Sequence, residues 1–429
     1  MRILVEPSDY TLRNAGDMAM LEVAVTRLGA LWPQASIQVF SDTPEIFPRY
    51  CPNVTPLPTT GRRAWFAPGP LARRLSSVLP GATRLERGLR RQWPALMRIL
   101  VRSRLKNCGN DGKDLEQFLC AVARADLLIV SGMGGLTDAF PDYARELLDV
   151  LGLATRRGRP TAMMSQGMGP LSDPGLRAQA KAVLPRVDLI ALREEHAGRP
   201  LLRSLGVSDD RIITTGDDAI EMAYRFRSDR LGTGLGVNLR ASSYSGVDAA
   251  LVQRLRPALH EAARRHKAPL LPVPISRVPG EADADTILEL LHGYDDRTDG
   301  GIGIDAPLKV IAQIQRCRVV VTGSYHAGVF ALSQGTPVVG VARSTYYVDK
   351  FVGLARQFGS GCVTVLADGS DLAGRLLTAI DRVWDSAFET RPGLLAAAAQ
   401  QIKLSQAAYR RVYELVECRA ATARVEVER

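Results

Sequence analysis

The chain has 429 residues, which is long for one domain and suits two that each bury a core. Its six cysteines include no C-x-x-C pair and its five histidines lack ligand spacing, so we expect a reduced compartment and no structural metal. The formal net charge is +10, and no charged leader or long apolar run marks a membrane-spanning segment. We therefore expect a cytoplasmic protein that is not integral to a membrane.

The first elements are typical of a parallel, doubly wound sheet. Residues 2–5 form an apolar run that predicts a buried strand, and residues 36–40 predict the next one. Between them a helix is expected to begin near Gly16, with Asp17 as its N-cap or as an acid in its first turn. Its apolar positions at helical spacing are Met18, Leu21, Val25 and Leu28.

Residues 61–107 form a strongly basic insertion. The segment carries eleven arginines and Lys106 against one acid, Glu86, so its charge is about +11 and the rest of the chain is nearly neutral. Apolar and aromatic residues alternate with these charges, a composition that suits the anionic surface of a membrane leaflet. A solvated or oligomer-contacting insertion is the equally weighted alternative. Nucleic acid is not expected as a partner, because no recognised nucleic-acid motif accompanies the charge.

Two glycine-bearing segments follow predicted strands. A strand over residues 125–130 runs into a segment with Gly134 and Gly135, whose glycines allow a positive φ and a close backbone approach to a ligand. A strand over residues 160–165 ends in Gln166 and Gly167, which we expect to line a cleft or to turn the chain.

The remaining strands of the first half also end in polar residues. The strand over residues 189–192 is followed by Arg193, and the strand over residues 211–214 by Asp217 and Asp218. Ligands of open α/β sheets bind at the carboxyl ends of the strands, so one mouth is expected to collect these side chains. We assign residues 1–226 to this first lobe.

A second α/β lobe is expected over residues 234–392, after a polar linker at residues 227–233. Its first strand leads to Arg240. A long helix near the C-terminus, within residues 393–429, is expected to pack back on the first lobe. The prediction is two facing Rossmann-like lobes with a cleft between them.

One segment of the second lobe carries the most information. Residues 318–321 predict a buried strand, and residues 327–333 predict a helix of small residues that follows a tight loop holding His326. The free N–H groups and the positive dipole end of a helix N-terminus favour an anionic ligand beside an acid/base imidazole. Phosphate or a phosphorylated substrate is the expected ligand.

Several of these segments together resemble the polysaccharide pyruvyl transferase family, whose fold is similar to that of GT-B glycosyltransferases. The resemblance covers most of the chain and omits the basic insertion. Its pieces are Asn14-Ala15-Gly16-Asp17-Met18-Ala19, Ser131-Gly132-Met133-Gly134-Gly135-Leu136, Gln166-Gly167-Met168-Gly169-Pro170, Leu192-Arg193-Glu194, Gly206-Val207, Thr215-Gly216-Asp217-Asp218-Ala219, Gly236-Val237-Asn238-Leu239-Arg240 and the segment around His326.

The resemblance implies transfer of the pyruvyl group of phosphoenolpyruvate to a sugar of a cell-surface polysaccharide or glycolipid precursor, with release of phosphate and no cofactor. His326 is the expected acid/base group, with Asp17 as a second catalytic candidate. Arg193, Arg240 and Arg343 are the arginines placed to hold phosphate and carboxylate. The acceptor is expected to be a sugar or a lipid-linked saccharide, with Asn14 and Gly16 shaping the donor or acceptor side, and the enzyme is expected to act at the inner face of the plasma membrane.

One position departs from the family pattern. Family members commonly carry arginine two residues before the histidine, whereas this chain has Ser324, followed by Tyr325. Arg343 is the expected replacement for the missing guanidinium. Two alternatives stay open: a GT-B glycosyltransferase with a nucleotide-sugar donor, and a catalytically silent relative that binds or scaffolds.

Overall fold

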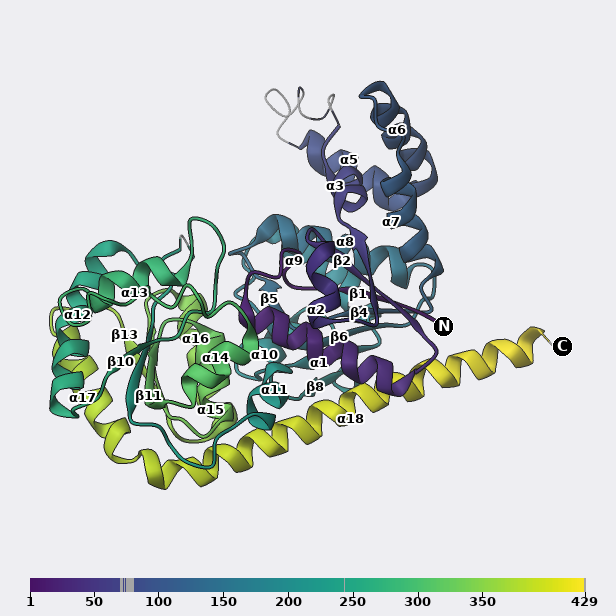
Figure 1. Ribbon diagram of the computed structural model, residues 1–429. Coiled ribbons are helices and arrows are strands. Elements are labelled where there is room, and N and C mark those ends of the chain that lie inside the picture. The colour runs from purple at the N-terminus through teal and green to yellow at the C-terminus, as the bar shows by residue number, and fades with distance from the viewer. Residues whose placement is uncertain (70–71, 73, 75–80, 243, 428–429) are drawn as a thin grey trace.

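The computed structural model describes residues 1–69, 72, 74, 81–242 and 244–427, which fold into two α/β lobes joined side by side (Figure 1). Of the basic insertion, Leu71, Arg73, Leu75, Val78 and Leu79 lie outside the described residues.

The first lobe is built on a parallel sheet with the strand order β3-β2-β1-β4-β6-β7-β8, and β5 pairs with β6. Side chains of β4 are buried throughout, as expected of a central strand that helices cover on both faces. The strands in chain order are β1 (Arg2–Glu6), β2 (Ser36–Ser41), β3 (Val54–Pro58), β4 (Leu127–Val130), β5 (Met133–Leu136), β6 (Thr161–Met168), β7 (Leu189–Leu192) and β8 (Ile212–Thr214).

The helices of the first lobe cover both faces of this sheet and form the insertion that rises from it (Figure 1). They are α1 (Ala15–Leu31), α2 (Phe47–Tyr50), α3 (Thr60–Phe66), α5 (Ala82–Gln92), α6 (Pro94–Asn107), α7 (Lys113–Arg124), α8 (Pro141–Thr155), α9 (Pro174–Val183), α10 (Gly198–Ser204) and α11 (Ala219–Arg225).

The second lobe is a smaller parallel sheet with the order β10-β9-β11-β12-β13. Its strands are β9 (Gly234–Asn238), β10 (Leu270–Pro272), β11 (Cys317–Thr322), β12 (Val338–Ala342) and β13 (Cys362–Leu366). Its helices are α12 (Ala249–Arg265), α13 (Asp283–Leu291), α14 (Pro307–Ile314), α15 (Tyr325–Ser333), α16 (Thr345–Phe358) and α17 (Leu372–Asp385).

The last helix, α18 (Ala387–Val427), runs beneath both lobes and ends beyond the first one (Figure 1). It contacts α15, α16 and α17 of the second lobe and then α1, α11 and β7 of the first. The sequence pattern suggested a helix over about residues 393–417, and α18 extends beyond both of these ends. Among the described residues, every helix is too short or too polar to span a lipid bilayer.

Backbone and core contacts fix the two lobes against each other. Asn14 forms a β-bridge with Ser276, and the Ala15 N–H donates to the Ile275 carbonyl at 2.9 Å. A continuous apolar core lies beneath these contacts and joins α1 and α11 to α14, α15 and α16. The mouths of the two sheets therefore face a common cleft.

Much of the positive charge of the basic insertion is compensated in the fold, because acids of the first lobe and of the insertion itself pair with its arginines. The pairs are Arg62 with Glu6 and Glu146, Arg63 with Asp42, Arg87 with Asp142, Arg90 with Glu86, Arg91 with Asp149, and Arg98 and Arg102 with Glu116. Most of these partners lie far from residues 61–107 in the sequence, so composition alone could not assign them.

Two local predictions need correction. Residues 131–138 do not use positive φ at Gly134 or Gly135, because the segment contains the short strand β5 that pairs with β6. Helix α15 begins at Tyr325, so His326 sits in its first turn and not on the preceding loop.

Candidate functional site

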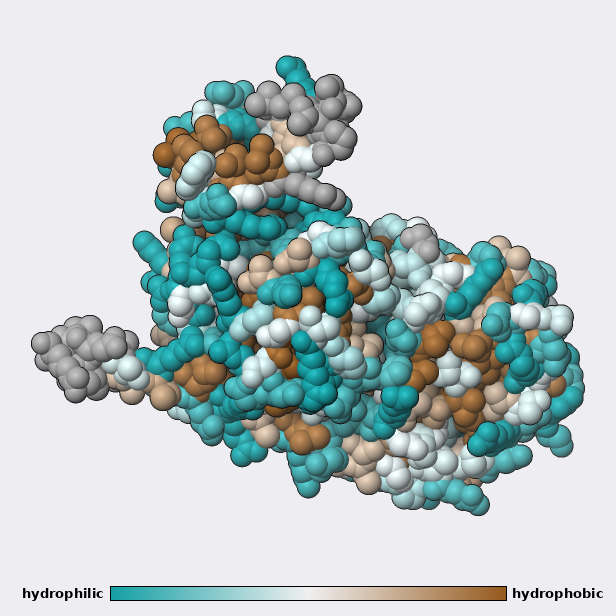
Figure 2. Space-filling model, turned by 180° about the vertical axis from the view of Figure 1, so that it is seen from behind, coloured by the Kyte–Doolittle hydropathy of each residue, from teal (hydrophilic) through white to brown (hydrophobic). Residues whose placement is uncertain are grey.

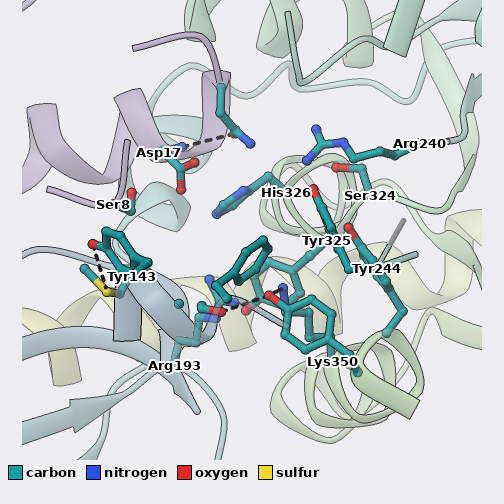
Figure 3. Close-up of a pocket in the computed structure, with 17 residues that line it drawn as sticks. Ser8, Asp17, Tyr143, Arg193, Arg240, Tyr244, Ser324, Tyr325, His326 and Lys350 are labelled. Carbon is teal, nitrogen blue, oxygen red and sulfur yellow. Dashed lines mark hydrogen bonds between the residues drawn. The ribbon is translucent and has the colours of Figure 1, made fainter. Parts of the chain in front are cut away.

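A pocket of about 270 Å³, lined by charged and aromatic side chains, lies between the lobes at the carboxyl ends of their strands (Figure 3). The first lobe contributes Ser8, Asn14, Asp17, Met133, Gly134, Gly135, Phe140, Tyr143 and Arg193. The second contributes Arg240, Tyr244, Ser324, Tyr325, His326, Tyr346, Tyr347 and Lys350.

The N-terminus of α1 forms one wall of the pocket. Asn14 is the N-cap of this helix, because its Oδ1 accepts from the Gly16 N–H at 3.0 Å and from the Asp17 N–H at 3.3 Å. Asp17 is thus the first-turn acid, and its carboxyl lies beside the His326 imidazole (Figure 3). Burial raises the pKa of Asp17, and the nearby His326 only partly opposes that effect.

His326 lies in the first turn of α15 and points across the cleft toward α1. Its Nε2 lies 3.7 Å from Asp217 Oδ2 and has no closer hydrogen-bond partner among the described residues. A Cβ on Gly16 would lie 2.0 Å from His326 Cγ, so glycine is needed there for the imidazole to fit. The imidazole therefore lies near two carboxylates, Asp17 of α1 and Asp217 of the loop after β8.

Asp217 is the buried partner of both His326 and Arg193. Burial by itself would raise the pKa of this carboxyl, but its interactions with His326 and Arg193 outweigh burial and lower it. Asp217 is therefore ionised at neutral pH, and it places a negative charge 3.7 Å from His326 Nε2.

Arg193 is buried beneath the pocket and is not the surface ion pair that is the usual alternative for such a residue. Its guanidinium lies 4.1 Å from the centre of the Tyr325 ring, and its Nη1 is 3.5 Å from Asp217 Oδ2. A Cβ on Gly134 or Gly167 would approach its side-chain nitrogens to 2.7 Å or less. These two glycines therefore make room for Arg193.

Arg240 reaches the pocket from the end of β9. Its Nε donates to Asp283 Oδ1 at 3.0 Å, and Asp283 also accepts from Asn238 Nδ2 at 2.8 Å. Because Asn238 in turn accepts from Thr322 Oγ1 at 3.1 Å, the Arg240 and His326 segments are tied together at their bases.

Lys350 of α16 is a pocket residue that sequence reasoning missed. Its Nζ donates to the Tyr346 hydroxyl at 2.5 Å and lies 3.7 Å from the centre of that ring. Burial and the neighbouring charge of Arg193 lower the pKa of Lys350 well below its usual value. The i, i+4 spacing of Tyr346 and Lys350 on a helix that follows β12 was the available signal.

An aromatic cluster, also missed, spans the cleft beside these cations. Phe140 of the first lobe and Tyr244 of the second have ring centres 4.9 Å apart, and Tyr244 stacks on Tyr347. The Tyr346 hydroxyl donates to the Gly134 carbonyl at 2.9 Å, which closes the cluster against β5.

Four predicted residues lie outside the pocket lining: Gly16, Gln166, Gly167 and Arg343. Gly16 and Gly167 lie behind it, where they make room for His326 and Arg193. The Gln166 side chain is buried and donates to the carbonyls of Ser131 and Met164, so it supports the sheet. Arg343 is half exposed and pairs with Asp248 at 2.9 Å beside a separate small hollow. The structure therefore does not bring Arg343 together with the other predicted residues. Among the described residues, no His, Cys, Asp and Glu side chains group as metal ligands.

The comparison with protein families shows which family the chain belongs to. The family model of polysaccharide pyruvyl transferase matches residues 14–345, which is more than half of the chain. The chain belongs to the polysaccharide pyruvyl transferase family. Most pocket residues of this family member lie inside the matched range, whereas Ser8, Tyr346, Tyr347 and Lys350 lie outside it. No curated protein matches the chain.

Solved structures show that the fold is shared with GT-B enzymes. A putative UDP-N-acetylglucosamine 2-epimerase from Listeria monocytogenes matches with a TM-score of 0.57 and 13% identity over 98% of this chain and 97% of that one. The HepE protein of Anabaena, solved in complex with UDP, matches with a TM-score of 0.53 and 11% identity over 97% of this chain and 100% of that one. The expected two-lobed GT-B architecture is confirmed.

Proposed function

We propose that this family member transfers the pyruvyl group of phosphoenolpyruvate to a sugar of a cell-surface polysaccharide or glycolipid precursor. The observation that carries the proposal is the set of three cationic side chains, Arg193, Arg240 and Lys350, around one small pocket with His326. Arg193 pairs with Asp217 and Arg240 with Asp283. Within the described part of the chain, by contrast, Lys350 has no carboxylate at ion-pair distance, and Asp17 and Asp217 act on it only from farther away. A small, strongly anionic donor supplies the missing charge.

The pocket groups match the proton transfers that this reaction needs. A sugar hydroxyl adds through its oxygen to the central carbon of phosphoenolpyruvate and loses its proton, while the methylene carbon takes up a proton and becomes a methyl group. A second hydroxyl then displaces phosphate and loses its own proton, which leaves a cyclic pyruvyl ketal and inorganic phosphate. Asp17 and His326 lie near each other and provide one proton donor and one acceptor, and the Asp217 carboxylate lies 3.7 Å from His326 Nε2. No cofactor enters these steps.

Donor and acceptor occupy neighbouring parts of the cleft in this proposal. The cations and the N-terminus of α15, where Ser324 and Tyr325 line the pocket, face the phosphate and carboxylate. The rings of Phe140, Tyr244 and Tyr347 offer apolar faces on which a sugar ring packs. Lys350 thereby takes the place of the cation that the family commonly carries at the position of Ser324.

A nucleotide-sugar donor is the second candidate. It is supported by Ser324 and by the similarity to a GT-B protein solved with UDP. Thermal unfolding with each ligand separates the candidates, because a ligand that binds only the folded state raises the midpoint. We expect phosphoenolpyruvate to raise it and UDP sugars to leave it unchanged. The reverse result would assign the protein to glycosyl transfer.

Matched variants show whether the rise comes from this pocket. Lys350→Met should abolish the stabilisation by phosphoenolpyruvate, whereas Arg343→Met should retain it because that side chain lies outside the pocket. Loss in Arg343→Met alone would support the arginine replacement predicted from the sequence. His326→Gln should still bind phosphoenolpyruvate but no longer release phosphate, because His326 is the proposed acid/base group. Unchanged phosphoenolpyruvate hydrolysis or transfer in that variant would contradict this role.

A further inference from the structure

We propose that the α5–α6 hairpin docks the protein on an anionic lipid bilayer by placing one apolar helical face in the interface. This inference does not depend on which donor the pocket binds. It rests on the side chains that the hairpin exposes, on the cations that border them and on the position of the hairpin in the molecule.

Helix α6 turns apolar side chains both inward and outward. Met97 and Val101 are buried against the first lobe, whereas Leu96, Ile99 and Leu100 are 49, 65 and 52% exposed. The spacing of these three, i, i+3 and i+4, places them on one face of the helix. Exposed apolar side chains grouped on one helical face mark an interaction surface, unlike those scattered singly.

The exposed face continues onto neighbouring elements. Trp93, which precedes α6, is 56% exposed, and Leu85 on α5 is 69% exposed. Between the helices runs an apolar groove of about 650 Å³ lined by Leu85, Leu89, Met97 and Leu100. Figure 2 shows the apolar side chains gathered on the projecting insertion. Tryptophan is a residue that favours the boundary between headgroups and acyl chains.

Cations border this apolar face. Arg102 and Lys106 follow Ile99 by three and seven residues, so they lie along one side of it. Among the described residues, Arg102 shares its one acidic partner, Glu116, with Arg98, and Arg104 donates only to backbone carbonyls. The hairpin therefore keeps a positive border after its ion pairs are formed. Charge of this sign attracts anionic headgroups while the apolar face is buried.

The same border argues against a second copy of the chain as the occupant. A two-fold contact through this face would bring the Arg102 and Lys106 side chains of both copies to one interface. Like charges at an interface oppose association, whereas an anionic bilayer pairs with them. A lipid surface is therefore the partner that fits both the apolar face and its border.

Tryptophan fluorescence tests the proposal at one residue. The chain has four tryptophans, and Trp32, Trp65 and Trp384 are buried, so Trp93 is the exposed one. With vesicles of phosphatidylcholine and phosphatidylglycerol that carry brominated acyl chains, we expect quenching of Trp93 emission and co-sedimentation of the protein. Pure phosphatidylcholine vesicles and high salt should weaken both signals.

A matched pair of substitutions assigns the binding to α6. The double variant Leu96→Gln/Ile99→Gln should weaken vesicle binding by about tenfold, because two aliphatic side chains leave the interface. Ile302→Gln is the control, since Ile302 is as exposed as Ile99, at 65%, and lies in the second lobe. The proposal is overturned if no vesicle quenches Trp93, if Ile302→Gln weakens binding equally, or if the double variant only converts a dimer into a monomer.

Discussion

Because Gly16 has no side chain, the His326 imidazole can occupy the space beside it. Adding a single carbon atom at Gly16 therefore tests the site. A Cβ there would lie 2.0 Å from His326 Cγ and 2.2 Å from Nδ1, so Gly16→Ala must displace the imidazole. We expect turnover to fall by about a hundredfold, since a displacement of that size misaligns a catalytic group. Steady-state kinetics with phosphoenolpyruvate and acceptor measure the effect.

Gly29 is the control for that substitution, because it lies in the same helix with no atom within 4 Å of an added Cβ. Gly29→Ala should leave turnover unchanged and stabilise the fold by about 0.5–1 kcal/mol through the lower conformational freedom of alanine. Equal losses of turnover in both variants would show that the helix, and not the imidazole, had been disturbed.

Lys350 links stability to pH through its lowered pKa. Where the folded pKa lies below the unfolded value of 10.5, the folded chain holds this proton less tightly. The free-energy cost of burying the charged Lys350 side chain is fully present below the folded pKa. This cost diminishes as the pH rises from that value toward 10.5. Lys350→Met should therefore be more stable than the parent at neutral pH, and the difference should shrink at alkaline pH.

Urea unfolding at a series of pH values measures this difference in the free energy of unfolding. A gap between the two proteins that stays constant with pH would contradict the assignment, because packing alone does not titrate. Saturating phosphoenolpyruvate should remove the advantage of the variant at neutral pH, since the ligand stabilises only the protein that retains the ammonium group.

At the scale of one element, α18 is held to the first lobe by a buried polar network. The Tyr409 hydroxyl donates to Asp218 at 2.8 Å. Asp218 also accepts a hydrogen bond from the Ser405 hydroxyl and forms an ion pair with the Arg27 guanidinium. Tyr409→Phe removes one hydrogen bond to a buried carboxylate and should lower the free energy of unfolding by about 1–2 kcal/mol.

Tyr413 provides the matched control one turn further along α18. Its ring packs on Trp32 and its hydroxyl has no hydrogen-bond partner among the described residues, so Tyr413→Phe should be close to neutral. Chemical denaturation of both variants decides the matter. Equal losses would mean that the Asp218 network contributes nothing specific to the docking of α18.

The insertion shows at this scale where composition misleads. Residues 61–107 carry an excess of arginine that indicates a free basic surface, yet the fold pairs Arg62 with Glu6 and Arg91 with Asp149. Those partners are separated from the insertion along the chain, and no local pattern announces them. Apolar exposure on α6 is a property of the fold, because spacing alone could not say which of its two apolar faces is buried.

At the scale of the whole molecule, the shared core beneath the cleft makes the lobes one cooperative unit. Met20 of α1 is fully buried in the core that joins α1 and α11 to helices of the second lobe. We expect one calorimetric transition for the chain, shifted as a whole by Met20→Ala, which should cost about 2–5 kcal/mol. Two transitions of which only one moves would show that the lobes unfold separately.

The sequence by itself determined the alternation of strands and helices, the parallel sheets and the gathering of polar residues at their carboxyl ends. These are local properties, because strand and helix periods and the ends of apolar runs are written in neighbouring residues. His326, Asp17, Arg193 and Arg240 were identified on that basis, and the structure brings all four to one pocket.

Only the tertiary structure decided which other groups complete that pocket. Lys350 lines it and Arg343 pairs with Asp248, although both lie within eight residues of the end of β12. The pocket's walls come from two lobes, so a side chain's neighbours depend on how the lobes pack and not on its own segment. The burial, charge and pKa of a side chain at such a site depend on those neighbours. The periodicity of residues along the chain does not show which neighbours these will be.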